Sequence, residues 1–255
     1  MQLLVVIPTY NCKLQIVRLL KSLQNIQHND ACQILIVDNQ SQDGTAEAAI
    51  STKNEIGISN LKVCSAIENN NLGGTIKIAF NEAKSRNFDF VAILHGDDQA
   101  EVRDLFEIWE KIKSSPKPST VLGSRFQKKS KLVGYSRARI FGNLVLNFIY
   151  SIVLRSKLSD LGSGLNVYKV SDITDLEYMK CSNSLYFNYQ LIILMIKNGL
   201  SFEYHPITWK ESDQKTNAKN IRIFLSALKV LLERSHGLNS APDNRVYGLR
   251  TLEDE

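Results

Sequence analysis

Residues 90–99 read FVAILHGDDQ, a continuous apolar run that ends in a histidine, a glycine and two adjacent aspartates. Similar short apolar runs occur at Leu3–Ile7, Ile34–Val37 and Leu61–Cys64. Runs that are apolar throughout are typical of strands buried on both faces of a parallel sheet. Segments with helical spacing lie between them. The sequence therefore predicts an α/β fold, with a Rossmann-like, mostly parallel sheet flanked by helices.

The predicted helices of the first half follow its strands in alternation. They cover 16–23, Thr45–Ile50, Gly74–Arg86 and Val102–Ile112. In the second half, a basic segment at 124–139 precedes further elements. These are apolar helices at Ile140–Leu154 and Tyr186–Ile196, a strand at Phe202–Ile207 and an amphipathic helix at Ile221–Leu232. Residues 237–255 are polar, and we expect them to be poorly ordered.

Composition narrows the class of protein. The chain has 255 residues, 44% of them hydrophobic, and a formal net charge of +5. This suits one large domain with a substantial core, and the mild positive charge permits an anionic partner. Nucleic acid is not an expected partner, because aromatic residues do not alternate with the basic residues as they do in stacking platforms for bases. The four cysteines lie far apart and form no CxxC pair, so neither a zinc site nor a disulfide framework is predicted.

The location of the protein is predicted from two apolar segments. The opening MQLLVVIPTY has no basic region before its short apolar run, so we expect a buried strand there rather than a signal peptide. The stretch Ile140–Leu154 is shorter than the roughly 18 apolar residues of a membrane-spanning helix. We therefore expect a cytoplasmic protein, with peripheral contact at the inner face of the membrane as an option.

Ligands of parallel sheets bind beyond the carboxyl ends of the strands, so the residues after each apolar run are candidates. Asp38 follows the second run directly and is placed to accept hydrogen bonds from a nucleobase or a ribose. Asp43 stands just before a predicted helix and suits a capping role. The segment Asn69–Gly74 offers backbone amides at a helix start, suited to phosphate oxygens, or else a simple turn.

The fourth run ends at Asp97 and Asp98. Adjacent carboxylates repel each other unless a cation or solvent intervenes, and Mg²⁺ prefers such hard oxygen ligands together with substrate phosphates. A solvated turn would leave the same pattern. The pair alone therefore supports a metal site only modestly.

Six segments together resemble the family 2 glycosyltransferases of GT-A fold, and within them the polyprenyl-phosphate (dolichol-phosphate-like) sugar synthases. The resemblance covers roughly residues 3–232, and no single segment is specific by itself. The segments are VVIPTYN at 5–11, VDNQSQDGT at 37–45, NNNLGG at 69–74, LHGDDQAEVRDL at 94–105, GSRF at 123–126 and SDLGSGLNVYK at 159–169.

The resemblance implies one domain with a nucleotide-sugar-binding half at 1–123, an acceptor half at 124–236 and a polar tail at 237–255. Asp97 would ligate Mg²⁺ or Mn²⁺ on the donor diphosphate. One departure concerns the metal motif, because His95 stands where the family has its first aspartate. The donor-binding residues implied are Pro8, Tyr10, Asp38, Asn71, Gly73, Asp97 and Gln99.

The implied acceptor is a polyprenyl phosphate, held by Arg125, Arg137, Arg139 and Ser163, with Arg137 and Ser163 counted as catalytic beside Asp97. Many relatives carry an acidic pair before the helix at 186–196, but residues 183–190 contain no acid. A phosphate acceptor is already largely anionic at neutral pH and needs no general base. The residues Trp209, Lys210, Gln214 and Lys215 resemble the family's loop over the acceptor.

Two alternatives remain open at this stage. A hydroxyl group of a glycan or glycolipid, in cell-surface polysaccharide synthesis, could accept the sugar if Asp160 or His95 served as base. A protein that binds sugar nucleotides without catalysis would also fit, because His95 alters the metal motif. The basic segment and the apolar helix at 140–154 favour a lipid acceptor at an anionic surface. A solvated loop followed by a core helix is the structural alternative.

Overall fold

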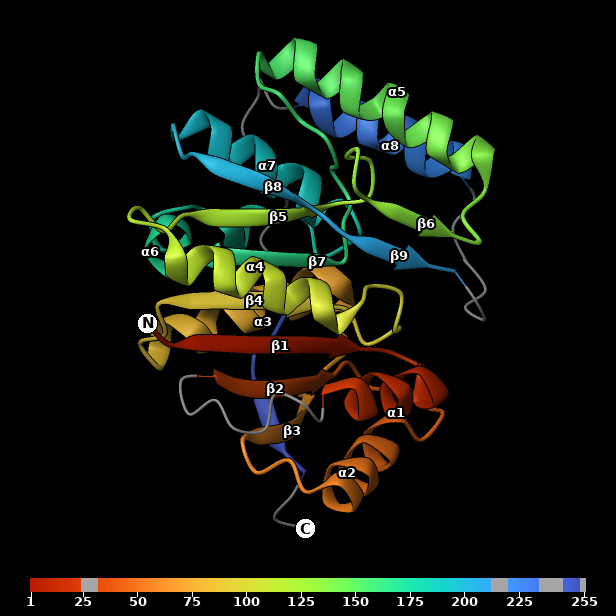
Figure 1. Ribbon diagram of the computed structural model, residues 1–255, viewed down its shortest axis with the longest axis vertical. Coiled ribbons are helices and arrows are strands. Elements are labelled where there is room, and N and C mark those ends of the chain that lie inside the picture. The colour runs from red at the N-terminus through yellow and green to blue at the C-terminus, as the bar shows by residue number, and fades with distance from the viewer. Residues whose placement is uncertain (24–31, 212–219, 234–244, 253–255) are drawn as a thin grey trace.

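The structure is a computed structural model that describes residues 1–23, 32–211, 220–233 and 245–252 (Figure 1). Its main sheet has eight strands in the order β10-β3-β2-β1-β4-β7-β5-β8. The strands are β1 (Leu3–Thr9), β2 (Cys32–Asp38), β3 (Leu61–Ala66), β4 (Phe90–Leu94), β5 (Thr120–Ser124), β7 (Leu165–Lys169), β8 (Phe202–Pro206) and β10 (Leu249–Thr251). Strands β1 to β4 run parallel, and β7 and β10 run antiparallel to their neighbours.

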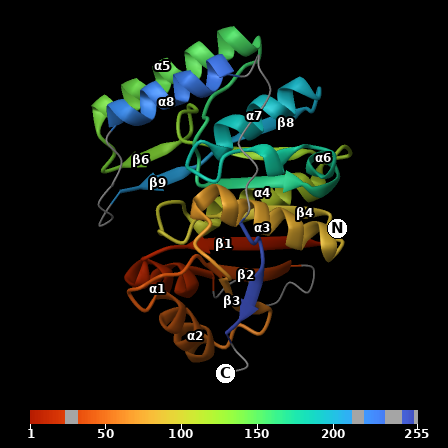
Figure 2. The ribbon, with the colours of Figure 1, turned by 180° about the vertical axis from the view of Figure 1, so that it is seen from behind.

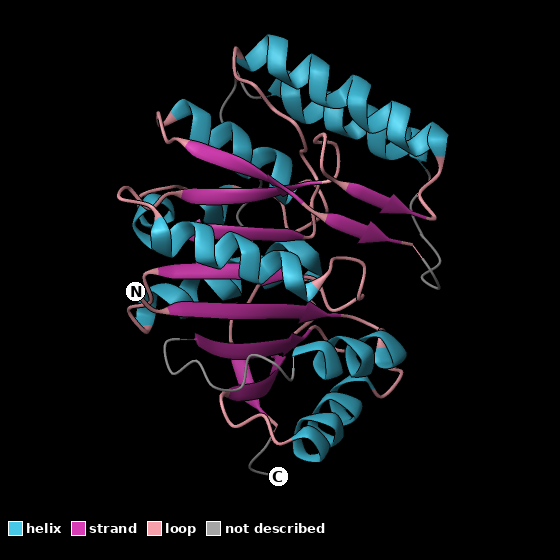
Figure 3. Ribbon diagram, viewed as in Figure 1, coloured by secondary structure: helices cyan, strands magenta, loops and turns pink. Residues whose placement is uncertain are grey.

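Helices cover both faces of this sheet, as Figure 3 shows. Alternate residues of β1 point to opposite faces, so Leu3, Val5 and Ile7 enter one core while Leu4 and Val6 enter the other. The first core is covered by α1 (Lys13–Ser22), α2 (Thr45–Ile56) and α4 (Val102–Ser114). The second is covered by α3 (Asn71–Ser85), α6 (Val170–Thr174), the 3₁₀ helix Tyr178–Lys180 and α7 (Phe187–Lys197), seen from behind in Figure 2.

A smaller unit lies beyond the β8 edge of the sheet. The short strands β6 (Lys131–Val133) and β9 (Thr208–Lys210) pair in parallel, and α5 (Arg137–Leu154) packs beside α8 (Asn220–Glu233). Figures 1 and 2 both show these two helices side by side at one end of the molecule. The predicted fold class is therefore confirmed, and its second half adds strands β5 and β7 inside the main sheet.

Two expectations from the sequence are wrong in detail. Part of the predicted polar tail is ordered, because β10 pairs with β3 and covers an edge that would otherwise leave backbone groups unpaired. Helix α5 begins three residues earlier than predicted and reaches 18 residues. By length and composition it is therefore long and apolar enough to cross a membrane, and only 17% of it is buried.

Candidate functional site

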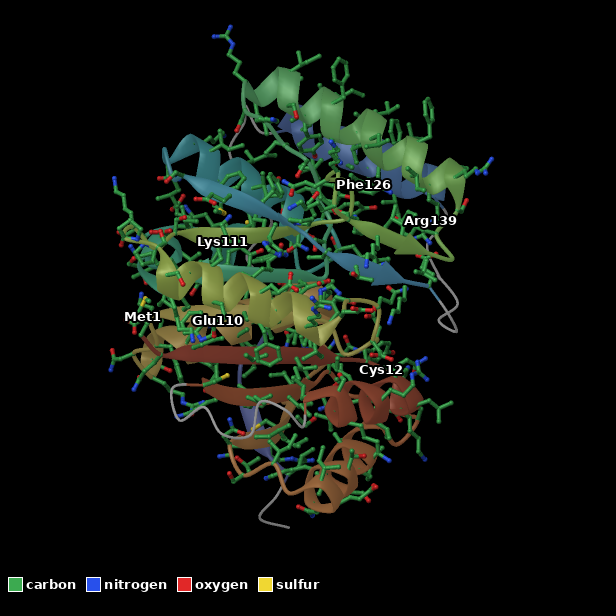
Figure 4. The ribbon with its side chains drawn as sticks, viewed as in Figure 1. Met1, Cys12, Glu110, Lys111, Phe126 and Arg139 are labelled. Carbon is green, nitrogen blue, oxygen red and sulfur yellow. The ribbon has the colours of Figure 1, made fainter. Side chains whose placement is uncertain are left out.

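The carboxyl ends of β1, β2, β3 and β4 meet at one edge of the sheet because these strands are parallel neighbours. Figure 4 shows Cys12, at the start of α1, and Arg139, at the start of α5, on this same side of the molecule. Pro8 lies within β1, past the last residue that pairs with β4, and its carbonyl accepts the Gly96 N–H at 3.0 Å. The four predicted strand ends are thus brought together.

At the end of β2, Asp38 is its last residue and is 4% exposed. One carboxylate oxygen accepts the Ser41 N–H at 3.0 Å, and the other lies 3.4 Å from the Thr9 hydroxyl. Only the first is a firm hydrogen bond, so the second oxygen retains capacity for a ligand. Tyr10, nearby at the end of β1, is 52% exposed and open to stack on one.

Asp43 supports two helix starts but is not itself a cap, because the N-cap residues are Gly44 in α2 and Cys12 in α1. Its carboxylate accepts the Thr45 N–H at 3.1 Å and the Lys13 N–H at 3.0 Å, so it joins the starts of α1 and α2. Slight burial raises the pKa of Asp43, but the hydrogen bond from the Thr45 hydroxyl and these two backbone hydrogen bonds outweigh it, and the pKa is lowered overall. Asp43 is therefore a structural carboxylate.

Two predicted donor-binding residues at the third strand end, Asn71 and Gly73, have different surroundings in the structure. Asn71 begins α3 with a φ of 54° and is exposed. Gly73 instead lies under the segment before α7, where its N–H donates to the Asn183 carbonyl at 2.8 Å. A Cβ at Gly73 would lie 2.6 Å from the Ser182 carbonyl oxygen, so this glycine permits close packing. Its N–H is therefore engaged within the protein, unlike the expectation for a phosphate-binding turn.

The two aspartates after β4 have separate surroundings. Asp98, with a φ of 58°, forms an ion pair with Arg18 of α1 at 2.9 Å. Asp97 is half-buried, and its carboxylate accepts only a long 3.3 Å contact from the Gln99 N–H. Burial raises the pKa of Asp97, with His95 opposing and Asp98 adding to the shift. Asp97 is thus the carboxylate of the pair that keeps coordinating capacity.

His95 turns its ring toward the second half of the chain. Its Nδ1 lies close to Gly164, where a Cβ would approach to 2.9 Å, and its buried Nε2 has no hydrogen-bond partner among the described residues. Burial lowers the pKa of His95, so the imidazole is neutral at physiological pH. Gln99 contributes its carbonyl to the Lys210 N–H at 2.8 Å, which ties this strand end to β9.

The protein ligands at this site fit a divalent cation only if a substrate supplies further oxygen ligands. Among the described residues, no three His, Cys, Asp or Glu side chains lie close enough to hold a metal ion by themselves. Asp97 would supply one hard oxygen ligand, and the Nε2 of His95, which interacts electrostatically with Asp97, has no hydrogen-bond partner among the described residues. One or two protein ligands completed by phosphate oxygens is the usual arrangement for Mg²⁺ in nucleotide sites.

On the acceptor side, Arg125 is buried rather than open. Its guanidinium pairs with both oxygens of Asp160 at 2.8 Å, and Asp160 also accepts the Arg125 backbone N–H at 2.9 Å. The rings of Tyr135 and Trp209 lie 5.7 and 5.3 Å from the guanidinium. Because both oxygens of Asp160 are engaged, this carboxylate is poorly placed to act as a general base.

The other predicted acceptor residues are not equivalent either. Arg137 is exposed at the first position of α5, whereas Arg139 is paired with Glu211 and stacks on Tyr135 at 4.5 Å. Ser163 is buried, and its hydroxyl donates to the Leu165 carbonyl at 3.1 Å within its own turn. Lys210 pairs with Glu101 at 2.6 Å. Gln214 and Lys215 lie outside the described residues.

Two residues of the site were missed from the sequence. Tyr135 joins the arginines, since its ring contacts both guanidinium groups and its hydroxyl accepts from Arg125 at 3.2 Å. Asn39 is buried, and its side chain bonds to Asn69 and to the Asn70 N–H at 3.0 and 2.8 Å. In the sequence, Tyr135 lies between Arg125 and Arg139, and Asn39 directly follows Asp38. These positions were the only signals that could have pointed to the two residues.

A cleft of about 690 Å³ is lined by a different set of residues. It is lined by acidic residues of α4, lysines of 128–131 and residues 204–208, and it includes none of the predicted site residues. The strand ends, by contrast, carry the two carboxylates, Asp38 and Asp97, that keep an oxygen for a ligand. We therefore take the strand ends, and not this cleft, as the candidate site.

The family model for glycosyl transferase family 2 matches residues 4–176, which include all four strand ends. The chain belongs to glycosyl transferase family 2. Solved structures support a GT-A fold for this family 2 chain. Glucosyl-3-phosphoglycerate synthase of Mycobacterium tuberculosis, in complex with Mn²⁺, UDP and phosphoglyceric acid, superimposes with a TM-score of 0.69 at 13% identity, over 98% of this chain and 86% of that one.

Three further proteins are similar to this glycosyltransferase. Mannosyl-3-phosphoglycerate synthase of Rubrobacter xylanophilus has a TM-score of 0.58 at 15% identity, covering 98% of this chain and 79% of that one. By sequence, the dolichyl-phosphate beta-glucosyltransferase of Saccharomyces cerevisiae is 23% identical over 94% of this chain and 77% of its own length. The uncharacterized protein MJ1222 of Methanocaldococcus jannaschii is 26% identical over 81% of this chain and 80% of its own length.

Proposed function

We propose that the protein transfers a sugar, with inversion, from a nucleotide sugar to a polyprenyl phosphate at a membrane surface. The observation that carries this proposal is the exposed apolar face of α5, which begins next to the candidate acceptor residues. The similarity to the yeast dolichyl-phosphate beta-glucosyltransferase supports a lipid phosphate as acceptor. The UDP in the complexes of the structural neighbours supports a UDP-linked sugar as the first donor to test.

The apolar face of α5 is formed by side chains that are three or four residues apart. Phe141, Leu144, Phe148 and Ile152 are 71%, 45%, 65% and 59% exposed. Four large apolar side chains on one helix face form a patch that monomeric soluble proteins rarely leave uncovered. Arg137 at the start of α5 adds positive charge beside the patch, as suits an anionic lipid headgroup. This face would hold the protein on the bilayer while the lipid phosphate enters the site.

On the donor side, Asp38 would accept hydrogen bonds from the nucleobase while Pro8 and Tyr10 border it. Asn71 and Gln99 would lie near the remainder of the donor, and Gly73 would act through packing. Asp97 would hold Mg²⁺ or Mn²⁺ on the diphosphate, and the ion would offset the negative charge of the departing nucleoside diphosphate. The segment before α7 also bonds to Gly73 of α3, so this half of the site is built on elements that are held together by hydrogen bonds.

In the transfer itself, a phosphate oxygen of the acceptor forms a bond to the anomeric carbon as the bond to the nucleoside diphosphate breaks. The acceptor phosphate is largely ionised at neutral pH, so no side chain has to remove a proton. This agrees with the absence of acids at 183–190 and with the engagement of Asp160 by Arg125. A hydroxyl acceptor would need a base, and these contacts therefore disfavour it. Arg137, with Arg139 and Ser163 behind it, would orient the phosphate.

A transfer assay tests the proposal. Purified protein is incubated with UDP- and GDP-linked hexoses, with MnCl₂ or MgCl₂, and with a short polyprenyl phosphate, 3-phosphoglycerate or a free glycan as acceptor. We expect transfer to the polyprenyl phosphate, dependence on a divalent ion, and a loss of at least about 100-fold in Asp97→Asn. Asp98→Asn is the matched control and should keep most of the activity.

Each other outcome has a defined meaning. Transfer only to 3-phosphoglycerate would refute the lipid acceptor, and the position of the new bond, at the phosphate or at the hydroxyl, would decide between the two acceptor chemistries. Transfer only to the glycan would favour the hydroxyl alternative. If the protein neither binds nor hydrolyses any nucleotide sugar, the enzyme assignment is refuted. Binding without turnover would support a non-catalytic protein.

A further inference from the structure

The segment Arg245–Leu252, which we call the C-terminal strap, lies along the outside of the nucleotide-sugar-binding half. Its strand β10 pairs antiparallel with β3, from Leu249 opposite Ala66 to Thr251 opposite Cys64. Figure 2 shows β10 beside β3, at the opposite end of the sheet from α5 and α8. The strap therefore adds the outermost strand to the half of the molecule that is most distant from it in sequence.

The strap also holds the loop that follows β3. This loop, residues 67–70, is the third of the four strand ends, and each of its residues bonds to the strap. The contacts are Ile67 N–H to the Gly248 carbonyl at 3.1 Å, Val246 N–H to the Glu68 carboxylate at 2.5 Å, the Arg245 guanidinium to the Asn69 carbonyl at 3.2 Å, and the Asn70 side-chain amide to the Val246 carbonyl at 3.2 Å.

From this loop the contacts continue into the site. The buried side chain of Asn39 donates to the Asn69 side-chain oxygen at 3.0 Å and accepts the Asn70 N–H at 2.8 Å. Asn39 is the next residue after Asp38, and its own N–H donates to the Thr9 carbonyl at 2.9 Å. A displacement of loop 67–70 would therefore change the surroundings of Asp38, since Asn39 bonds to both neighbouring strand ends.

We propose that the first part of the C-terminal strap, residues 245–248, belongs to the donor site: it sets the position of loop 67–70 and, through Asn39, of Asp38 against the nucleoside. This inference rests on the proposed function, because it takes the strand ends as the nucleotide site. Arg245 and Val246 are then positioning residues, since they act through the loop and not on the reacting atoms. Loss of strap contacts would weaken nucleotide binding while leaving chemistry at saturating donor unchanged.

The test uses the full chain and isothermal titration with UDP and with GDP in the presence of MnCl₂. Val246→Pro removes the N–H that Glu68 accepts without a change of charge, and Arg245→Ala removes the bond to Asn69. Arg250→Ala, at the exposed position of β10, is the matched control that removes one positive charge from the same segment. We expect the nucleotide Kd to rise about 3- to 10-fold in the first two variants and by less than about twofold in the control.

Kinetics separate positioning from a general loss of structure. In Arg245→Ala and Val246→Pro the donor KM should rise while kcat and the acceptor KM stay at the values of Arg250→Ala. Unchanged Kd values in both variants would refute the role of the strap. The proposed function would remain intact in that case, because the wild-type chain would still bind the nucleotide. Weakening in Arg245→Ala alone would also refute it, because a direct contact of the guanidinium with phosphate would then explain the effect. A wild-type chain that binds neither nucleotide would refute the proposed function and this inference with it.

Discussion

At the scale of single residues, neighbouring charges in this chain have different tasks. Asp97 and Asp98 are adjacent in sequence, but Asp98 is paired with Arg18 while Asp97 retains an oxygen for a ligand. Arg137 and Arg139 are two positions apart, but only Arg139 is held by Glu211 and Tyr135. The left-handed backbone at Asp98 turns the two carboxylates apart and explains the first difference.

The exposed position of Arg137 leads to a prediction for acceptor binding. Arg137→Ala should raise the KM for a polyprenyl phosphate roughly 10-fold and leave the donor KM within about twofold, because one charge-assisted hydrogen bond to phosphate is lost. Steady-state kinetics with each substrate varied in turn measures both constants. Lys157→Ala, exposed beyond the other end of α5, is the control. Equal changes in the two KM values would contradict a contact between Arg137 and the acceptor.

Asp104 leads to a prediction about pH. Burial raises the pKa of Asp104 to about 6, with the Thr208 N–H at 2.5 Å opposing the shift. The folded state therefore holds this proton more tightly than the unfolded chain, so the contribution of Asp104 to stability is full below about pH 4 and is lost as the pH rises through about 6. Asp104→Asn should remove that loss.

Urea unfolding at pH 4.5 and 7.5 checks the effect of Asp104. From pH 4.5 to pH 7.5, the free energy of unfolding of Asp104→Asn should change more favourably than that of the wild type, by roughly 1–3 kcal/mol. This range follows because each unit of pKa shift corresponds to about 1.4 kcal/mol. Glu110→Gln, on the exposed side of the same helix, is the control and should follow the wild type. The prediction is contradicted by a variant whose stability changes with pH as much as the wild type's.

At the scale of elements, α5 combines a structural and a surface role. Leu146 and Tyr150 are buried in the core on one side, and the Tyr150 hydroxyl donates to the Ala227 carbonyl of α8 at 2.6 Å. The opposite side carries the exposed row that contains Phe141 and Phe148. A helix that is apolar on both sides is either covered by a partner or buried in lipid.

The double variant Phe141→Ser/Phe148→Ser tests which surface α5 faces. Its binding to vesicles that contain anionic lipid, measured by co-sedimentation, should fall roughly 10-fold or more, because two aromatic side chains are removed from contact with lipid. Titration with UDP should be unaffected. Leu14→Ser, which removes an exposed apolar residue from α1, is the control. Undiminished vesicle binding would contradict a membrane-facing α5.

At the scale of the whole molecule, Lys77 joins three distant segments. It is fully buried in α3, and its ammonium donates to the Cys181 carbonyl and the Asn183 side chain at 2.6 Å and lies 3.2 Å from the Tyr247 hydroxyl. The segment before α7 and the C-terminal strap therefore meet on α3. These contacts connect the first half of the chain to the segments around residues 181–183 and 247.

Lys77→Met should lower the free energy of unfolding by about 2–4 kcal/mol, because the methionine fills the space but leaves the buried Cys181 and Asn183 oxygens without a charged donor. Urea unfolding of the full chain measures the change. The matched control is Lys84→Met, an exposed lysine in the last turn of the same helix. If the two variants unfold at the same urea concentration, Lys77 does not join these segments in the way the contacts indicate.

Much of the fold could be predicted because its cause is local. The apolar runs of β1 to β4 are continuous, and strands of this kind are stable only between two layers of helices, so the parallel sheet follows from the pattern. Strand β4 matched its predicted bounds, Phe90–Leu94. Strands β5 and β7 were missed as strands because glycine, serine and asparagine interrupt their apolar pattern, and β10 was missed because it is short and lies in a polar segment.

The sequence by itself determined the parallel sheet, the four polar strand ends and the membership of the chain in its family, because these depend on residue types in a fixed order. Only the tertiary structure decided which polar groups are occupied. Asp160 neutralises Arg125, Asn183 occupies the Gly73 amide, and the strap reaches loop 67–70 from the far end of the chain. Such pairings join residues that are distant in sequence, and they form because a buried polar group must find its partner wherever the folded chain brings one.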